Sequence, residues 1–341
     1  MTDALKSELR RIAAAVAFPA AGVVAFAGRS LPQAGAAAAN PMAGMQPAAN
    51  PLIAQLQQLL YEGCYCRPFT GAPPQPPAPS AQNGGFVEAL SAGNASRERW
   101  DAGWQIRQLL PSGQVAVVKG AMTRLVWPGE FLAHGAPGTA PRPGAEVSLF
   151  APRESRTMQP GFYFSFGEAL GDQEDEFAIV RLYWNVRADG AARLIGGVTQ
   201  ALNRYAVPFR CKCLSVPAYY DRTDAAVLYL GKRHYRIAAA LLAESYPKLR
   251  PLLDQPTPLF SKPLADGLGL AENPRSGESF GMHCCRLVAE AICAAHARAS
   301  DTPQARLDAI AAAFAGAGQS LDRPYLNPGS ADRYDFAVPA S

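Results

Sequence analysis

The middle of the chain alternates between hydrophobic and polar residues with a period of two, which predicts β-strands with two different faces. The alternation covers residues 161–168, 180–186, 207–217 and 224–230. A hydrophobic spacing typical of helices recurs elsewhere, at residues 4–17, 51–62, 190–204, 233–246, 280–298 and 302–316. Strands that are grouped before helices, with few β-α-β alternations, favour an α+β fold: a largely antiparallel twisted sheet flanked by helices.

Stretches rich in proline, glycine and alanine suggest how this fold is divided. The segment "GAPPQPPAPSAQNGG" at 71–85 predicts an extended, semi-rigid connector. We therefore expect an N-terminal helical segment with a flexible Ala/Pro-rich loop at 1–70, and an α+β core domain at 86–341.

If the strands pair, one face of the sheet is expected to be apolar and the other polar and basic. Within 161–168 the three phenylalanines point one way and Tyr163 the other, while Cys211 and Cys213 share the apolar side of their strand. The polar face is expected to carry Tyr163, Arg181, Tyr183, Asn185, Arg210 and Lys212.

Charge is concentrated near this face. The whole chain of 341 residues has a net charge of only +4, but residues 193–250 contain ten Lys and Arg against three Asp and Glu, a local charge of +7. Arginine side chains bind phosphate oxygens through paired hydrogen bonds, so the pattern suits a phosphorylated ligand. The alternative is an ordinary solvated face whose cations pair with acids such as those at 168–176.

Composition narrows the class of protein. Hydrophobic residues make up 49% of the chain and charged residues 18%, which is typical of a globular protein. Seven cysteines in so long a chain predict a reducing, cytoplasmic environment. Residues 12–28 follow two arginines as in a signal peptide, but Asp3, Glu8 and Pro19 argue against that interpretation. No later stretch is long enough to span a bilayer.

The segment 273–291, "NPRSGESFGMHCCRLVAEA", contains one of only four histidines. On a helix, His283, Arg286 and Glu290 form a polar stripe and Cys285 lies on the opposite, apolar face. The short motifs "CYC", "CKC" and "CC" lack the second pair of ligands that a zinc site needs, so no metal is expected.

Two interpretations of His283 remain open. It can be a surface histidine beside an ordinary Arg286–Glu290 pair. Alternatively, the turn that contains Glu278 and Ser279 holds it as a general acid or phosphate ligand.

Several longer stretches resemble the HopA family, named for a type III secretion effector of a plant pathogen. The resemblance covers roughly residues 55–295, and the matching stretches, in order, are "YEGCYCRPF", "RWDAGW", "PGFYFSFGEA", "VRLYWNV", "VTQALN", "VPFRCKCL", "YYDRTDAAVLYL", "FSKPLADGLGLAENP" and "GESFGMHCCRLVAEA". The family has His-Arg-Cys-Arg near the histidine, so Cys284 stands in place of an arginine.

The resemblance implies a function in lanthipeptide and thioamitide biosynthesis. There a kinase-like partner phosphorylates Ser or Thr of a precursor peptide, and the HopA-like protein eliminates the phosphate to leave a dehydroamino acid. This chemistry needs a base, cationic groups for the phosphate and an acid, but no cofactor. The expected partners are thus a phosphorylated precursor peptide and a kinase-like protein, with no nucleic acid and no membrane.

The sheet face offers residues for each step. Lys212, flanked by Arg210, is the expected base, because burial and neighbouring cations favour a neutral lysine. His283 is the expected acid, and Tyr163 or Tyr229 would stabilise the developing enolate. The expected phosphate and substrate contacts are Arg181, Arg210, Arg222, Lys262, Arg286, Glu278 and Ser279. A second candidate for the base is the Lys-x-His triplet at 232–234, interpreted as a turn between a strand and a helix.

Two alternatives belong to other classes. The poorly periodic first fifty residues resemble the flexible region of a protein secreted by a type III system, which would bind a partner protein without chemistry. A nucleic-acid-binding protein ranks last, because the total charge is small and no motif supports it.

Overall fold

A computed structural model describes residues 1–31, 50–72, 84–135 and 140–338. Within them the α-helices are α1 (Asp3–Ala14), α2 (Pro51–Leu60), α3 (Gly84–Gly93), α4 (Gln173–Phe177), α5 (Ala191–Asn203), α6 (Tyr235–Leu249), α7 (Phe280–Ala297) and α8 (Pro303–Gly316). A π-helical turn, Tyr61–Tyr65, continues α2.

The described strands form three sheets, in which every pairing is antiparallel. The first contains β1 (Val16–Ala20), β2 (Val23–Phe26) and β3 (Arg29–Ser30). The second contains β4 (Arg99–Leu109), β5 (Val115–Lys119), β6 (Met122–Val126), β7 (Phe131–Ala133) and β8 (Glu146–Ala151). The third contains β9 (Glu154–Ser155), β10 (Phe162–Phe166), β11 (Ile179–Trp184), β12 (Phe209–Leu214), β13 (Ala226–Gly231), β14 (Lys262–Ala265) and β15 (Leu268–Glu272).

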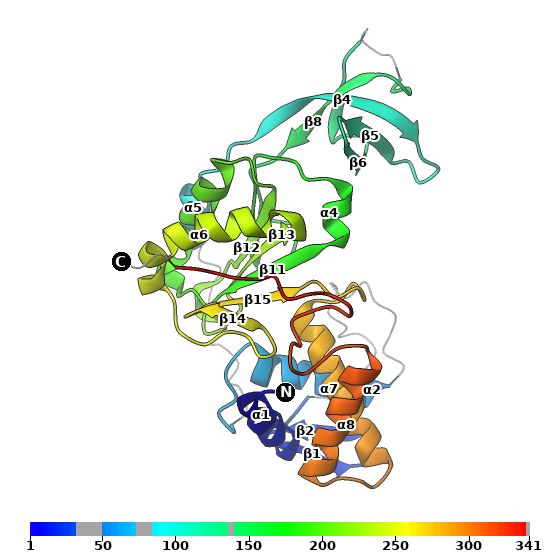
Figure 1. Ribbon diagram of the computed structural model, residues 1–341, viewed down its shortest axis with the longest axis vertical. Coiled ribbons are helices and arrows are strands. Elements are labelled where there is room, and N and C mark those ends of the chain that lie inside the picture. The colour runs from blue at the N-terminus through cyan, green and yellow to red at the C-terminus, as the bar shows by residue number, and fades with distance from the viewer. Residues whose placement is uncertain (32–49, 73–83, 136–139, 339–341) are drawn as a thin grey trace.

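The seven-stranded sheet is the centre of the molecule, with the strand order β14-β15-β11-β13-β12-β10-β9 (Figure 1). Its first face packs against α5 and α6, where Leu182, Trp184, Cys211 and Cys213 are buried. The expected apolar face is therefore confirmed for β11 and β12. Together with the antiparallel pairing, it confirms the α+β fold class.

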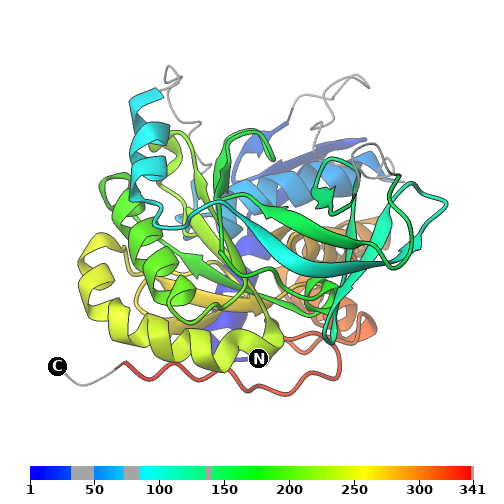
Figure 2. The ribbon, with the colours of Figure 1, turned by 90° about the horizontal axis from the view of Figure 1, so that it is seen from above.

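The second face of this sheet is only partly covered by helices. The core on this side joins α1, α2, α7 and α8 to residues of β11, β13 and β15, such as Tyr183, Val227 and Ala271. N-terminal and C-terminal helices thus share one core, and Figure 2 shows them on the side of the sheet away from α5 and α6. No residue of β10 or β12 belongs to that core, and on this side Phe166, Arg210 and Lys212 are partly exposed.

The five-stranded sheet was not expected from the sequence. It projects from the rest of the molecule (Figure 1) and has its own small core around Trp104, Val117 and Val147. Residues 86–341, expected as one domain, thus contain two sheets with separate cores. The expected connector at 71–85 lies largely outside the described residues.

The helices expected at 51–62, 190–204, 233–246, 280–298 and 302–316 are confirmed to within a few residues at each end. The first expected helix, 4–17, is too long: it ends at Ala14, and residues 16–26 form a β-hairpin in which Val16, Val24 and Phe26 are buried. The β-branched residues of this hairpin explain the difference, because they favour strands. Within the described residues no helix is long and apolar enough to cross a membrane.

A close contact at Gly281 fixes α7 against the π-helical turn. A Cβ atom at this position would overlap the ring of Tyr65, which is itself buried. We predict that Gly281→Ala lowers the free energy of unfolding by about 1–3 kcal/mol through overpacking. Gly316→Ala is the matched control, because that glycine lies in α8 with open space around it; the exchange should be neutral or stabilising. Equal denaturation midpoints for the two variants would contradict this packing.

Candidate anion-binding site

Three cations surround one aromatic ring on the open part of the second face. Arg181, Tyr229 and Arg210 pair across β11, β13 and β12 in one row of the sheet. The guanidinium carbons of Arg181 and Arg210 lie 5.3 Å and 4.9 Å from the centre of the Tyr229 ring. Lys212 lies two residues along β12, with its Nζ 6.0 Å from the same ring and 4.2 Å from that of Phe162. We call Arg181, Arg210, Lys212 and Tyr229 the cation cluster.

The cation cluster contains no ion pair. Within the described residues, no carboxylate lies within 4.0 Å of its three cations. Arg181 donates to the amide oxygen of Asn273 at 2.8 Å, and Lys212 to that of Gln159 at 3.4 Å. All three side chains are half-buried. Three neighbouring positive charges without a carboxylate form an arrangement suited to a multivalent anion.

Arg222, another expected phosphate ligand, is already neutralised. It donates twice to the carboxylate of Asp224, at 2.8 Å and 2.9 Å, and once to the Tyr61 hydroxyl at 3.0 Å. Burial raises the pKa of the Asp224 carboxyl, but Arg222 and then Lys212 outweigh this and hold it below its usual range. The Arg222–Asp224 pair therefore borders the cation cluster as a fixed wall.

The π-helical turn packs against the Arg222–Asp224 pair through Tyr61. Tyr61 and Tyr65 stack with ring centres 5.4 Å apart, and Tyr65 meets the ring of Tyr183 edge-on at 6.4 Å. The buried hydroxyls of Tyr65 and Tyr183 have no hydrogen-bond partner among the described residues. π-helical turns occur frequently at functional sites. Sequence reasoning missed this turn, although "YEGCYC" was among the stretches that resemble the family.

A second polar cluster lies at the start of α7. Glu278 is buried and accepts from Arg286 at 2.9 Å, while the two ring nitrogens of His283 lie 3.0 Å from Gln319 and 3.3 Å from Arg286. Ser279 caps the helix by accepting from the backbone of Met282. Burial raises the pKa of Glu278, but His283 and Arg286 outweigh it and lower the value to about 2.

These four residues are thus close together, as expected from the sequence. No hydrogen bond or ion pair among the described residues connects them to the cation cluster. The expectation that Lys212 and His283 act together, as base and acid, stays a prediction.

The expectation that Tyr163 lies on the polar face is wrong. Tyr163 pairs with Cys213 and is fully buried on the α5 side of the sheet. Its hydroxyl donates to Glu154 at 2.8 Å and accepts from Asn94, which allows a tyrosine to be buried there. Phe164 and Phe166 instead share the face of Lys212 and Arg210, because they pair with them in register. Tyr229, the other tyrosine that the sequence suggested, lies in the cation cluster.

Two further candidates lie outside the cation cluster. Lys262 donates to both oxygens of Asp332 at 2.9 Å and to the carbonyl of Tyr334, so it fastens the C-terminal segment to the edge of the sheet. The triplet at 232–234 is a turn between β13 and α6, as expected. There Lys232 pairs with the buried Glu272 at 2.8 Å, and Arg233 with Asp175.

The cysteines expected in the core, Cys211, Cys213 and Cys285, are buried, as is Cys284. Burial raises the pKa of the Cys284 thiol well above its usual range, followed by a smaller contribution in the same direction from Glu278. Among residues 1–31, 50–72, 84–135 and 140–338, no group of three His, Cys, Asp or Glu is placed to hold a metal ion.

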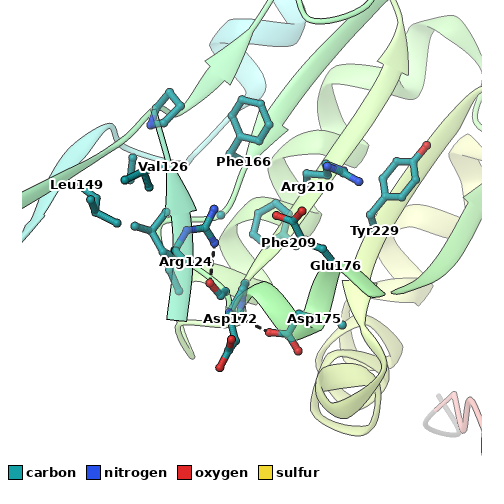
Figure 3. Close-up of a pocket in the computed structure, with 18 of the residues that line it drawn as sticks. Arg124, Val126, Leu149, Phe166, Asp172, Asp175, Glu176, Phe209, Arg210 and Tyr229 are labelled. Carbon is teal, nitrogen blue, oxygen red and sulfur yellow. Dashed lines mark hydrogen bonds between the residues drawn. The ribbon is translucent and has the colours of Figure 1, made fainter. Parts of the chain in front are cut away.

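A cavity of about 420 Å³ opens beside the cation cluster, between the five-stranded and seven-stranded sheets. Figure 3 shows Arg210 and Tyr229 on one side and Arg124, Val126 and Leu149 on the other. Two members of the cation cluster thus also line this cavity. Its position depends on how the two sheets meet, and nothing in the sequence pattern indicates this.

The fold and site define an α+β protein in which a cluster of three cations, with no carboxylate within 4.0 Å of them among the described residues, lies beside a cavity. The sequence model of the HopA1 effector protein family matches residues 153–326, more than half of the chain. The chain belongs to this family. All members of the cation cluster lie within the matched range.

Two solved structures are similar to this chain. One is the effector protein from Pseudomonas syringae pv. tomato strain DC3000, with 15% identity, a TM-score of 0.44, and coverage of 83% of this chain and 92% of the other. The second is the effector protein from Pseudomonas syringae pv. syringae strain 61, with 17% identity, a TM-score of 0.39, and coverage of 79% and 88%. A search of curated proteins found no match.

Two lysines of the sheet allow a test of the unpaired charges. Lys212→Met should change stability by less than about 1 kcal/mol, because it removes both repulsion from Arg181 and Arg210 and attraction to Asp224. Lys262→Met should lower stability by about 1–3 kcal/mol, because it leaves Asp332 without its cation. Urea denaturation of both variants measures the difference. A larger loss for Lys212→Met would show that this charge is compensated in the folded protein.

The lowered pKa of Glu278 predicts a pH dependence of stability. The pKa of Glu278 in the folded protein, about 2, lies below the pKa of the unfolded chain. The stabilisation from the ionised carboxylate is therefore fully present above about pH 5 and is lost as pH falls through 2. Glu278→Gln should therefore cost roughly 3 kcal/mol at pH 7, and progressively less toward pH 2. Denaturation at several pH values checks this. Glu290→Gln is the control: Glu290 is a more exposed partner of Arg286, so its exchange should lower stability by under about 1 kcal/mol. A stability loss in Glu278→Gln that is the same at every pH would contradict the assignment.

Proposed function

We propose that this protein is a lyase that eliminates phosphate from phosphoserine or phosphothreonine of a peptide. The observation that carries the proposal is the cation cluster, in which Arg181, Arg210 and Lys212 have no carboxylate within 4.0 Å among the described residues. A phosphate monoester carries about −1.5 to −2 charges at pH 7 and offers several acceptor oxygens. It matches the charge of the cluster and the geometry of its guanidinium groups.

The reaction removes a proton and a phosphate from adjacent carbons. Lys212 first releases its proton to solvent. Its amine then takes the proton from Cα, and the electrons of that C–H bond form the Cα=Cβ double bond. The Cβ–O bond breaks, and its electrons remain on the phosphate oxygen, which takes a proton from solvent and leaves as hydrogen phosphate. The products are a dehydroamino acid in the peptide, hydrogen phosphate and Lys212 in its original protonated state. Atoms and charges balance without an added reagent.

Each member of the cation cluster has a role in this step. Arg181 and Arg210 hold the phosphate and stabilise the charge that develops on it as it leaves. They lie on either side of the Tyr229 ring, at 5.3 Å and 4.9 Å from its centre, and can therefore grip one anion from two directions. The Tyr229 hydroxyl is available to donate to the enolate that forms at the peptide carbonyl.

The cluster at the start of α7 is a less direct candidate for catalysis. Both nitrogens of His283 already have neighbours, Gln319 on one side and Arg286 on the other. We therefore assign the proton transfer to Lys212 and assign no step to His283. The supply of a phosphopeptide by a kinase-like partner, in the cytoplasm, remains part of the proposal.

The second candidate function is phosphopeptide binding without chemistry, in an effector secreted by a type III system. The family name favours it, because it describes effector proteins and mentions no enzymatic activity. The two candidates share the cation cluster as binding site. They differ in whether the bound peptide changes mass.

Incubation with a phosphothreonine peptide separates the two candidates. We expect the peptide to lose the mass of phosphoric acid with the native protein. Lys212→Ala should reduce the rate by at least about a thousandfold, while it binds the peptide within about tenfold of the native affinity. Lys248→Ala is the matched control, because this lysine is exposed on α6 and should leave the rate unchanged.

Each outcome has a distinct meaning. If binding depends on the phosphate but no peptide loses mass, the second candidate, an effector that binds phosphopeptides without chemistry, is supported. Full activity of Lys212→Ala would remove the assignment of the base. Absence of phosphate-dependent binding would refute both functions.

A further inference from the structure

The cavity beside the cation cluster has a different chemical character from the cluster itself. Apolar side chains from both sheets line it, including Val126 and Leu149 from the five-stranded sheet and Phe166 and Phe209 from the seven-stranded sheet. Its volume of about 420 Å³ lies in the range of small-ligand pockets, which is about 300–1,000 Å³.

The cavity and the cation cluster share Arg210 and Tyr229. A ligand held by both would therefore be anionic at one point and apolar immediately beside it. In an extended peptide, neighbouring residues are about 3.3 Å apart and consecutive side chains point to opposite sides. A residue within two positions of a phosphorylated residue can thus reach the cavity while the phosphate stays on the cluster.

The charged residues of the cavity limit which side chains fit. Asp172, Asp175 and Glu176, near or in α4, line the cavity and outnumber its two cations, Arg124 and Arg210 (Figure 3). Asp175 pairs with Arg233, whereas Glu176 has no ion pair among the described residues. An acidic side chain in the cavity would meet these carboxylates, whereas an aliphatic or aromatic one would meet the apolar lining.

We propose that this cavity is a specificity pocket for a large apolar side chain, located within two residues of the phosphorylated residue of the substrate. The proposal rests on the proposed function, because it takes the cation cluster as the phosphate site. It names the substrate class more closely: a phosphopeptide with leucine, phenylalanine or a similar residue beside the phosphoresidue.

A peptide series tests this on the native protein. Each phosphothreonine peptide carries glycine at the two positions on either side, and one of these positions is exchanged in turn for leucine, phenylalanine or aspartate. At one position, leucine or phenylalanine should improve affinity and kcat/KM roughly ten- to hundredfold over glycine. Aspartate at that position should be no better than glycine.

A filled cavity gives a second test. Ala169 lines the cavity and is half-buried, so Ala169→Phe places a ring in this space. The preference for leucine over glycine should then fall at least about tenfold. Ala240→Phe is the matched control, because that alanine is exposed on α6, and it should keep the native preference.

The outcomes separate the pocket from the proposed function. Phosphate-dependent binding or turnover that is indifferent to all four positions would refute the pocket and leave the lyase proposal intact. An undiminished leucine preference in Ala169→Phe would place the specificity pocket elsewhere. If no phosphopeptide binds, both proposals fail together.

Discussion

The function that we propose depends on one electrostatic arrangement: three cations around the ring of Tyr229, with no carboxylate of the described residues within 4.0 Å. Cations at protein surfaces are ordinarily paired or well solvated, and several in this molecule are paired, as Lys262 is with Asp332 and Arg222 with Asp224. The aromatic ring compensates part of the charge, since each cation–π contact contributes roughly 0.5–2 kcal/mol. The positive charge that the ring does not compensate would be balanced by a bound anion.

The way in which the helices cover the sheet makes this arrangement possible. N-terminal and C-terminal helices form a common core over β15, β11 and part of β13, and the core ends before β12 and β10. Arg181 lies at its boundary, where Asn273 holds its guanidinium. Arg210 and Lys212 lie beyond the boundary, and Arg210 also lines the cavity between the two sheets. One face of one sheet therefore serves as core at one end and, in our proposal, as the ligand surface at the other.

Much of the fold could be predicted from the sequence, because amphipathic helices such as α5, α7 and α8 have a clear period, and β11 and β12 alternate cleanly. The alternation says that a strand has two faces, but not which of them is buried. Tyr163 was assigned to the wrong face for this reason: its hydroxyl is satisfied by Glu154, which makes burial possible.

Whether each cation has a partner in the folded protein could not be predicted from the sequence either. The partner of Lys262 is 70 positions away, and the Asn273 that holds Arg181 is 92 positions away. Only the folded chain distinguishes Lys262, which pairs with Asp332, from Lys212, which has no ion pair in the part of the chain that the structure describes. The cavity depends on contact between two sheets that no local pattern encodes.

The most direct test of this account is a crystal structure with a phosphothreonine peptide in which a methylene group replaces the bridging oxygen, so that the phosphonate cannot leave. The account predicts phosphonate oxygens within hydrogen-bond distance of the Arg181 and Arg210 guanidinium groups and of the Lys212 amine. A phosphonate bound at Arg286 and His283, with the cation cluster unoccupied, would contradict it.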